Sequence, residues 1–566
     1  MLESISIFCN LRQKFVIIFF FITQLIISLL ELITLSLIPI FILYLTDPKK
    51  VYDKIDNIND FISENLFQVF FFQSITSLFV IMVILLLIKN FLQMFLSFTE
   101  GYLVKILNYQ TITKVFNITL NQSLTKLISR KGSEYLRNIN SESTQSVGYL
   151  MSQFLILKEL LLLSFIILTL FLNNKFTGLI SLILIIIAAF SIFLFLNKKL
   201  IIKGKASFIT KSNLIEGITN YLNIIKEIKI YRLEKFFTDY FQKNLRIKLK
   251  NDFFKYLVSK LPRNIFEISI IIIIIILSLV AKKTSIDFKE YLPLLGLTII
   301  AFLRIIPVLS SINSSYAGLV YNYVSFQTIK KILLNQKNEN KNVLNKKNIF
   351  LIKDFKKIKF SNLNFKFNEN QIFENFSFEI NKNKIIGIIG PSGIGKSTLL
   401  NIITGILKVE NLEIFIDGNI LHHKEFEFSS VGYVSQSTFL INGSIIENIA
   451  LGKNIEDLKN KKIKKIVDIS GVKDLLEKSN LNLQSNVSDK GQNLSGGQIQ
   501  RIGIARALYR EPSFLLLDEA TNQIDRKNKI QILEKLKNNY TNMTTIIVSH
   551  DQEITKYCDE LIDLNG

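Results

Sequence analysis

Six long apolar runs constrain the fold of this 566-residue chain more than any other feature. They cover residues 15–45, 66–88, 149–172, 177–197, 261–281 and 290–313. Each run has the roughly 20 apolar residues that a membrane-spanning helix needs. No small-residue cleavage site follows the first run, so we interpret it as a retained helix rather than a signal peptide. The pattern predicts an α-helical six-span transmembrane domain over residues 1–324.

The chain is also strongly basic, with 68 Lys+Arg against 46 Asp+Glu and a formal net charge of +22. Such an excess can reflect a nucleic-acid partner, an anionic membrane surface or the composition of an AT-rich genome. Many of the basic residues lie in the two long connectors, 89–148 and 198–260. The positive-inside rule then places both termini and these connectors in the cytoplasm. We therefore expect a multi-pass membrane protein with membrane lipids around it and no nucleic-acid partner.

The connectors carry structure of their own. Helix-compatible sequence continues into both long connectors, which predicts long cytoplasmic helix extensions that turn near residues 116–124 and 217–228. On the outer side, apolar residues from Val51 to Ile62 recur at helical spacing and predict a short amphipathic helix at the membrane face. That helix either packs against the bundle or takes part in transport.

Five ionisable residues interrupt the apolar runs: Glu31, Lys158, Glu159, Glu267 and Arg304. Each lies about 14 residues from the outer end of its predicted span, or about 20 Å below the outer surface. A charge at that depth costs a few kcal/mol unless it pairs or meets water. Two interpretations stay open. The charges form salt bridges between helices, or Arg304 and Lys158 face a hydrated cavity and bind an anionic head group.

A hydrophilic region separates the apolar half from the rest of the chain. Lys and Asn dominate residues 330–348, so we predict a linker over 325–348 and an α/β domain over 349–566. In that domain a buried strand, 384–389, precedes a glycine-rich loop and an apolar helix start. The loop comprises Gly390, Pro391, Ser392, Gly393, Ile394, Gly395, Lys396, Ser397 and Thr398.

This loop has the spacing of a P-loop between a strand and a helix. Its glycines let backbone N–H groups wrap the phosphates of ATP at a helix N-terminus. Lys396 is expected to meet the β- and γ-phosphates, and the Ser397 hydroxyl to bind Mg²⁺.

A second strand, 514–517, ends in two adjacent carboxylates, Asp518 and Glu519. On its own such a pair is common at helix caps. After a P-loop it predicts a catalytic arrangement in which Asp518 holds Mg²⁺ and Glu519 polarises the attacking water.

The third motif is Leu494-Ser495-Gly496-Gly497-Gln498, followed by an amphipathic helix. Together with the P-loop and Glu519, it resembles the signature motif of ABC transporter ATPases. Six spans followed by one nucleotide-binding domain is the layout of ABC exporter half-transporters, so the resemblance covers the whole chain. It implies that Ser495, Gly496, Gly497 and Gln498 contact ATP bound to a second copy, and hence a homodimer.

The resemblance assigns roles to other residues. Gln436 matches the Q-loop glutamine, which ligates Mg²⁺ and links the γ-phosphate to the membrane helices, and His550 matches the switch histidine. Phe367 lies where the family stacks an aromatic ring on adenine, although a core role stays open. Asp525 matches the aspartate that the family has at this position. Asn522 stands where the family more often has serine, which puts in doubt the contact that the family makes here with the second copy.

Within the exporters the chain resembles bacterial PglK-type flippases of lipid-linked oligosaccharides. The likeness rests on residues 301–307 around Arg304, the membrane glutamates, Pro262-Arg263 and the outer connector. It implies an amphipathic or lipid-linked anionic substrate and the cytoplasmic membrane of a bacterium. The alternatives are a peptide or bacteriocin exporter, a lipid or multidrug exporter, and an ATP-gated channel or regulator.

Overall fold

The computed structural model describes most of the chain. The described residues are 2–46, 75–173, 175–283, 288–343, 349–352, 354–367, 370–409, 411–421, 425–453, 460–487, 493–549 and 552–564. The chain divides into two compact units. One comprises Met1–Gln122 with Leu127–Asn340, and the other Lys341–Gly566 with Ser123–Lys126.

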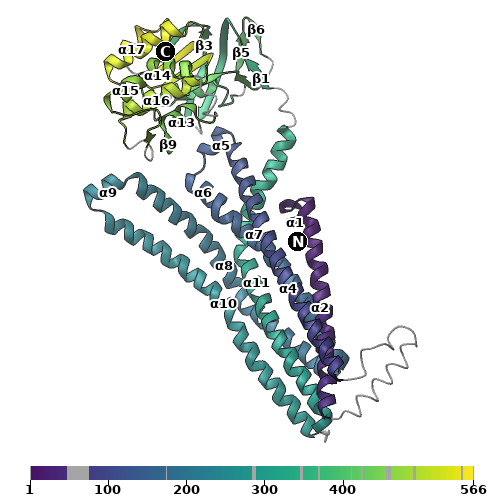
Figure 1. Cartoon of the computed structure of the whole chain (residues 1–566). Helices are drawn as coiled ribbons and strands as arrows, with labels where there is room; N and C mark the ends of the chain where they lie inside the picture. Colours follow the sequence, from purple (N-terminus) through teal and green to yellow (C-terminus); the bar gives the residue numbers. More distant parts are fainter. Residues whose placement is uncertain are drawn as a thin grey trace. The chain divides into compact units, whose positions relative to one another are not determined.

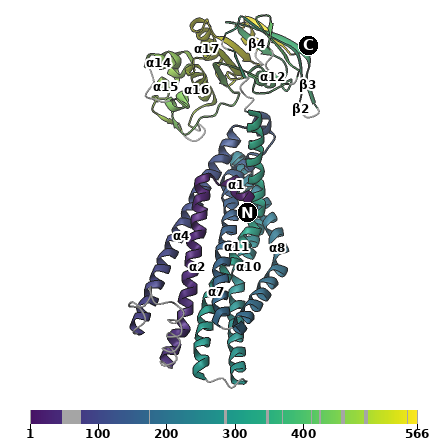
Figure 2. The same cartoon turned by 90° about the vertical axis from the view of Figure 1, so that its right-hand side faces the viewer.

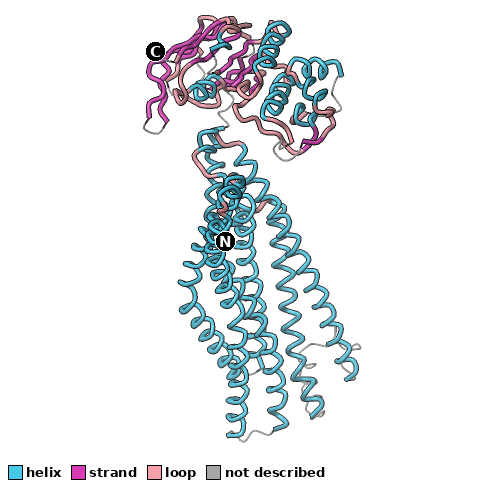
Figure 3. The backbone as a smooth tube through the Cα atoms, turned by 90° about the vertical axis from the view of Figure 1, so that its left-hand side faces the viewer, coloured by secondary structure: helices cyan, strands magenta, loops and turns pink. Residues whose placement is uncertain are grey.

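The chain up to residue 343 is helical throughout its described residues, apart from short turns (Figure 3). Its helices are α1 Leu2–Phe8, α2 Leu11–Thr46, α4 Ile75–Leu120, α5 Leu124–Ile128, α6 Gly132–Arg137, the π-helix η1 Asn138–Glu142, α7 Ser143–Asn173, α8 Lys175–Asn223, α9 Ile225–Tyr231, α10 Glu234–Lys283 and α11 Phe288–Val343.

The long helices pack as a bundle (Figures 1 and 2). Helix α2 packs against α4 and α7, while α8 packs against α7 and α10. Buried apolar side chains from α2, α7 and α11 form one shared cluster that includes Leu35, Ile166 and Phe302. In Figure 1, α8 and α10 run together to the turn at α9. The bundle therefore brings together helices that lie far apart in the sequence.

Among the described residues, four helical stretches are long and apolar enough to cross a membrane: Leu11–Thr46, Phe79–Leu120, Gly132–Asn173 and Leu292–Asn335. They confirm a helical membrane region with long extensions, because each is 36 residues or longer. The predicted spans 177–197 and 261–281 fall within α8 and α10 and stay predictions. The amphipathic helix expected over 51–62 lies outside the described residues.

One long helix runs through most of the segment predicted as a linker, and its role between the domains stays a prediction. Helix α11 continues to Val343, so most of the expected linker over 325–348 is helical. Its inward residues explain why the helix persists, because Phe326, Ile329 and Leu333 are buried against the other long helices.

The second unit combines strands and helices. Its strands are β1 Ile349–Ile352, β2 Lys357–Phe367, β3 Asn370–Asn381, β4 Ile385–Ile389, β5 Glu413–Ile416, β6 Asn419–Ile420, β7 Glu425–Phe428, β8 Val431–Val434, β9 Gly443–Ser444, β10 Asn486–Val487, β11 Phe514–Asp518, β12 Thr544–Val548 and β13 Glu560–Asp563. Its helices are α12 Lys396–Ile403, α13 Ile445–Ala450, α14 Asn460–Ile469, α15 Val472–Lys478, α16 Gly496–Tyr509, α17 Arg526–Asn539 and α18 Gln552–Thr555.

Two main sheets organise this unit. A five-stranded parallel sheet has the order β13-β4-β12-β11-β8, and a four-stranded antiparallel sheet has the order β3-β2-β5-β6. Shorter pairs join β1 with β7 and β9 with β10. In the parallel sheet all carboxyl ends lie at one edge, where ligands bind in open α/β folds.

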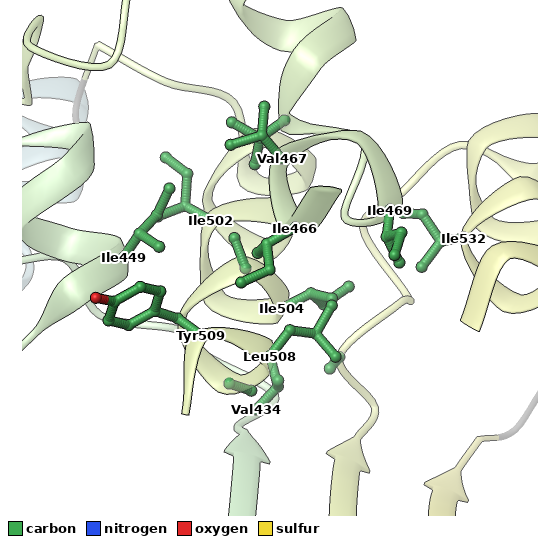
Figure 4. Close-up of a cluster of buried hydrophobic side chains, with 14 of the residues drawn as sticks. Val434, Ile449, Ile466, Val467, Ile469, Ile502, Ile504, Leu508, Tyr509 and Ile532 are labelled. Carbon is green, nitrogen blue, oxygen red and sulfur yellow. The ribbon is translucent and has the colours of Figure 1, made fainter. Parts of the chain in front are cut away.

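The three central strands of the parallel sheet, β4, β12 and β11, are buried on both faces, as their continuous apolar sequences require. In β11, Phe514 and Leu516 face one core with α12, while Leu515 and Leu517 face the other. Figure 4 shows the second core, where residues of α16 such as Ile504 and Leu508 meet β8 and α14. Each fully buried side chain of this size stabilises the fold by about 1.5–3 kcal/mol. This packing holds the strand ends in place.

Candidate functional site

The predicted P-loop lies at the carboxyl edge of the parallel sheet. Strand β4 ends at Ile389, and α12 begins at Lys396 with Gly395 as its N-cap. Gly395 has a φ of 109°, and a Cβ there would lie 2.5 Å from Cγ2 of Ile372, so only glycine fits. The other residues of the predicted loop, from Gly390 to Ile394, form the turn between the two elements, and Ser397 and Thr398 start the helix.

The turn holds the Lys396 side chain. Its Nζ donates hydrogen bonds to the carbonyl oxygens of Gly390, at 2.8 Å, and Pro391, at 2.9 Å. Burial lowers the pKa of Lys396, and the carboxylates of Glu519 and Asp518 oppose that shift. The ammonium therefore lies inside the loop that would surround a phosphate chain.

Asp518 joins the P-loop helix to the neighbouring strands. The Ser397 hydroxyl donates to its Oδ1 at 3.1 Å, and the Tyr433 hydroxyl donates to its Oδ2 at 3.2 Å. Burial raises the pKa of Asp518, while these two hydrogen bonds lower it. Partial burial and the Asp518 charge raise the pKa of Tyr433 to about 12, so Tyr433 stays a donor.

Glu519 follows β11 in an unusual conformation. Its φ is 50°, in the left-handed region that glycine favours, and its backbone N–H donates to the Val548 carbonyl at 3.1 Å. Such a conformation costs about 1–3 kcal/mol and is found mostly at functional sites. The Glu519 Oε2 accepts from Gln436 Nε2 at 2.7 Å and from Asn522 Nδ2 at 3.2 Å. Gln436, which follows the end of β8, therefore contacts the predicted base, Glu519, directly.

The signature residues form the start of α16. Ser495 is its N-cap and makes a capping box with Gln498, and Gly496 and Gly497 open the first turn. Gln498 Nε2 also donates to the Ser479 hydroxyl at 3.3 Å. Within the described part of the chain, the recorded hydrogen bonds of Ser495 and Gln498 do not reach the P-loop. These residues present a helix N-terminus that the chain's own P-loop does not use.

Three predicted residues lie around these motifs. Phe367 ends β2 opposite Asn370 in β3, and His550 lies outside the described residues, directly after Ser549 at the end of β12. Asp525 is the N-cap of α17, and hydrogen bonds from Asn528 help to lower its pKa. Its local role is therefore to begin a helix.

Four of the five charges predicted within the apolar runs fall into two clusters, and Glu267 lies outside both. In the first cluster, the Glu31 carboxylate of α2 pairs with Lys89 of α4 at 2.5 Å and with Arg304 of α11 at 3.2 Å. The side chains of Glu31 and Lys89 are only 5% and 6% exposed, whereas that of Arg304 is 49% exposed. One buried carboxylate is therefore shared by two cations.

The second cluster lies about two helical turns along α11 from the first. Lys158 of α7 pairs with Glu100 of α4 at 3.5 Å and with Glu159 at 3.9 Å, and Ser311 of α11 donates to Glu159 at 3.1 Å. Glu267 joins neither cluster by a recorded contact. It pairs at 3.0 Å with Arg263, four residues earlier on α10, and both side chains are exposed.

Sequence reasoning missed several of these partners. Lys89 and Glu100 were overlooked because they follow the apolar run 66–88 and lie in the part of α4 that was predicted as an extension of the span. Tyr433 could have been found, because it lies three residues before Gln436 on a strand. Nothing in the sequence pairs Asn522 with Glu519, because that contact depends on how the loop after β11 folds back.

Comparison with known proteins agrees with this geometry. Residues 373–522 match the model of the ABC transporter family. The C-terminal unit is an ABC ATPase domain. A 195-residue stretch is 36% identical to the lacticin-481/lactococcin-DR transport/processing ATP-binding protein of Lactococcus lactis subsp. lactis, and covers 34% of this chain and 27% of that protein. A 217-residue stretch is 33% identical to a probable ABC transporter ATP-binding/permease protein of Haemophilus influenzae, and covers 38% of this chain and 39% of that protein.

The alignments with these curated relatives thus cover only about a quarter to two fifths of each relative. A solved structure extends the likeness to the whole chain. A bacterial Atm1-family ABC exporter with ATP bound superposes with a TM-score of 0.72 and 18% identity, over 95% of this chain and 93% of that one. The complete chain therefore has the fold of an ABC exporter.

Proposed function

We propose that this protein is an ATP-hydrolysing ABC exporter. The observation that carries the proposal is the convergence of Lys396, Ser397, Asp518, Gln436 and Glu519 at one edge of a sheet, in a chain that also has long apolar helices. A fold alone does not imply function, but this set of groups supports phosphoryl transfer.

Each group has a distinct task. Lys396 neutralises the β- and γ-phosphates, and the N–H groups of the P-loop bind their oxygens. Glu519 orients and polarises the water that attacks the γ-phosphorus. The Ser397 hydroxyl and the Asp518 carboxylate are 3.1 Å apart and are hard oxygen donors, so with the Gln436 amide oxygen they would hold Mg²⁺. The metal would neutralise charge on the phosphates.

A second copy of the chain completes the site. The N-terminus of α16, with Ser495 and its two glycines, makes its recorded hydrogen bonds away from the P-loop of its own chain. A helix N-terminus favours anions, so in a homodimer it would close over the γ-phosphate held by the other copy. ATP binding would draw the two ATPase domains together, and hydrolysis would release them.

The cargo is proposed to be a lipid-linked oligosaccharide or a related amphipathic anion. Arg304 supports this, because its guanidinium lies on an apolar helix, is half exposed and shares its carboxylate partner with Lys89. Such a guanidinium suits a pyrophosphate, which it can bind through two hydrogen bonds. The proposal also puts the spans in the cytoplasmic membrane of a bacterium, with both termini in the cytoplasm, and the lysine-rich connectors support that orientation.

A flipping assay in proteoliposomes tests the proposal. Wild type, Glu519→Gln and Arg304→Ala would be compared with a fluorescent lipid-linked oligosaccharide, and ATP hydrolysis measured in parallel. We expect Glu519→Gln to abolish hydrolysis and flipping, and Arg304→Ala to abolish flipping while basal hydrolysis persists. Flipping that survives Arg304→Ala would discard the cargo assignment and leave a peptide, lipid or multidrug exporter. If the rate of ATP hydrolysis stayed the same with every lipid-linked sugar, peptide and lipid added, the result would favour a channel or regulator.

A further inference from the structure

Five residues of the ATPase domain form a closed circuit of hydrogen bonds. Gln436 Nε2 and Asn522 Nδ2 both donate to Glu519 Oε2, at 2.7 and 3.2 Å. Gln500 Nε2 donates to the Gln436 carbonyl at 3.4 Å, and Gln500 Oε1 accepts from the Gln523 backbone at 3.0 Å. Because Gln523 follows Asn522 in the chain, the circuit closes on itself. It joins the segment after β8, helix α16 and the segment after β11.

Most of the circuit is held rigidly. Gln500 is 2% exposed, so its amide has few alternative partners. The segment with Gln523 lies directly on α16, since a Cβ added to Gly497 would be 2.6 Å from the Gln523 carbonyl oxygen. The backbone next to Asn522 therefore has a defined position. Its side chain, in contrast, is exposed and can be replaced without opening a cavity.

We propose that Asn522 is a positioning residue that keeps the Glu519 carboxylate aimed at the attacking water. This inference rests on the proposed role of Glu519 as the base. In the described conformation Gln436 makes the shorter bond to Glu519. When the Gln436 side chain turns toward Mg²⁺ and the γ-phosphate, Glu519 loses that donor. Asn522, anchored through Gln523 and Gln500, then still donates to the carboxylate and keeps it oriented.

The side-chain length matters for this role. A serine, which is more common at this position in the resembled family, ends one bond closer to the backbone than the amide nitrogen of asparagine. At the backbone position that the circuit holds, a hydroxyl would not span the 3.2 Å contact made by the longer amide. The Asn522 contact thus belongs to this chain's own loop.

The test measures steady-state ATP hydrolysis by the full-length protein in proteoliposomes. The variants are Asn522→Ser and Asn522→Leu, with Glu519→Gln as the reference for loss of the base. Asn381→Ser is the matched control, because Asn381 Nδ2 donates to Glu560 Oε1 at 2.9 Å in another asparagine–glutamate pair, between β3 and β13. For every variant, kcat and the KM for ATP are determined separately.

We expect kcat to fall about tenfold in both Asn522 variants, with KM for ATP unchanged, because the lost bond goes to a charged group. Asn381→Ser should behave as wild type. A kcat of the Asn522 variants within about twofold of wild type would overturn the inference. A loss of kcat/KM that came from a higher KM for ATP instead of a lower kcat would overturn it too. If Glu519→Gln itself kept wild-type hydrolysis, the proposed function would fail first.

Discussion

Lys396 in the ATPase domain and Lys89 in the helical unit are both 5% exposed, but different kinds of partner hold them. Lys396 donates to two backbone carbonyls five and six residues earlier in the chain. Lys89 pairs with Glu31, 58 residues away on another helix. The first arrangement is local and can be read from a motif. The second exists only when helices pack. Lys396 thus lies in the loop proposed to bind phosphate, whereas Lys89 neutralises a carboxylate of a neighbouring helix.

Replacing the two lysines by methionine should therefore have opposite effects. For Lys396→Met we expect ATP hydrolysis to fall at least about 100-fold, because the charge that meets the phosphates is lost, while the thermal midpoint changes little. Hydrolysis by purified protein and thermal unfolding would be measured together. Lys359→Met, at an exposed position on β2, is the control. A large drop in the thermal midpoint would show that Lys396, like Lys89, stabilises the fold, and would contradict the contrast between the two lysines.

Lys89→Met should destabilise the fold by about 3 kcal/mol, because Glu31 loses its buried cation and keeps only the half-exposed Arg304. Hydrolysis per folded molecule should persist. Thermal unfolding in detergent measures the loss, and Glu31→Gln added to Lys89→Met should recover most of it. If the double variant were as unstable as the single one, the charge pair would not be the cause.

Tyr321→Phe tests a tertiary contact in the extension of α11. The Tyr321 hydroxyl donates to Asp252 of α10, which also pairs with Lys248 at 3.2 Å. We expect a loss of about 1–2 kcal/mol, smaller than for Lys89, because Asp252 retains an ion pair. Thermal unfolding of Tyr321→Phe beside Tyr323→Phe, an exposed tyrosine of the same helix, would measure it. Equal losses for both variants would contradict a specific contribution from the hydroxyl.

Arg263→Met should have the smallest effect, within about 0.5 kcal/mol of wild type. The Arg263–Glu267 pair lies within one helix, and its side chains are 63% and 46% exposed. The same thermal assay measures it. A loss comparable to that of Lys89→Met would show that this pair becomes buried when two copies assemble, and would move it into the same class as the membrane clusters.

Much of the ATPase site follows from the sequence because its parts are contiguous. The strand before Gly390, the helix after Lys396 and the strand before Asp518 were all expected, and β4, α12 and β11 occur there. Parallel strand order then places their carboxyl ends together. The contact of Asn522 with Glu519 was not predictable, because it depends on the conformation of the loop after β11.

The helical unit was predicted less completely. Helix-compatible sequence beyond the apolar run 66–88 predicted an extension that turns near residues 116–124, and α4 does continue to Leu120. The sequence did not show which charged residues of this extension meet other helices. The region around Lys330 had the composition of a linker, yet α11 extends through it because Phe326, Ile329 and Leu333 are buried. Hydropathy averages miss such helices, because one apolar stripe is enough for packing.

The sequence by itself determined the class of this protein: apolar runs long enough for a membrane, and motifs in which neighbouring residues assemble a phosphate site. These features depend on spacing along the chain, which is fixed before folding. Only the tertiary structure decided which charges meet. Glu31 stands between Lys89 and Arg304, and Glu519 between Gln436 and Asn522, because packing brings together groups whose separation in sequence carries no record of their distance.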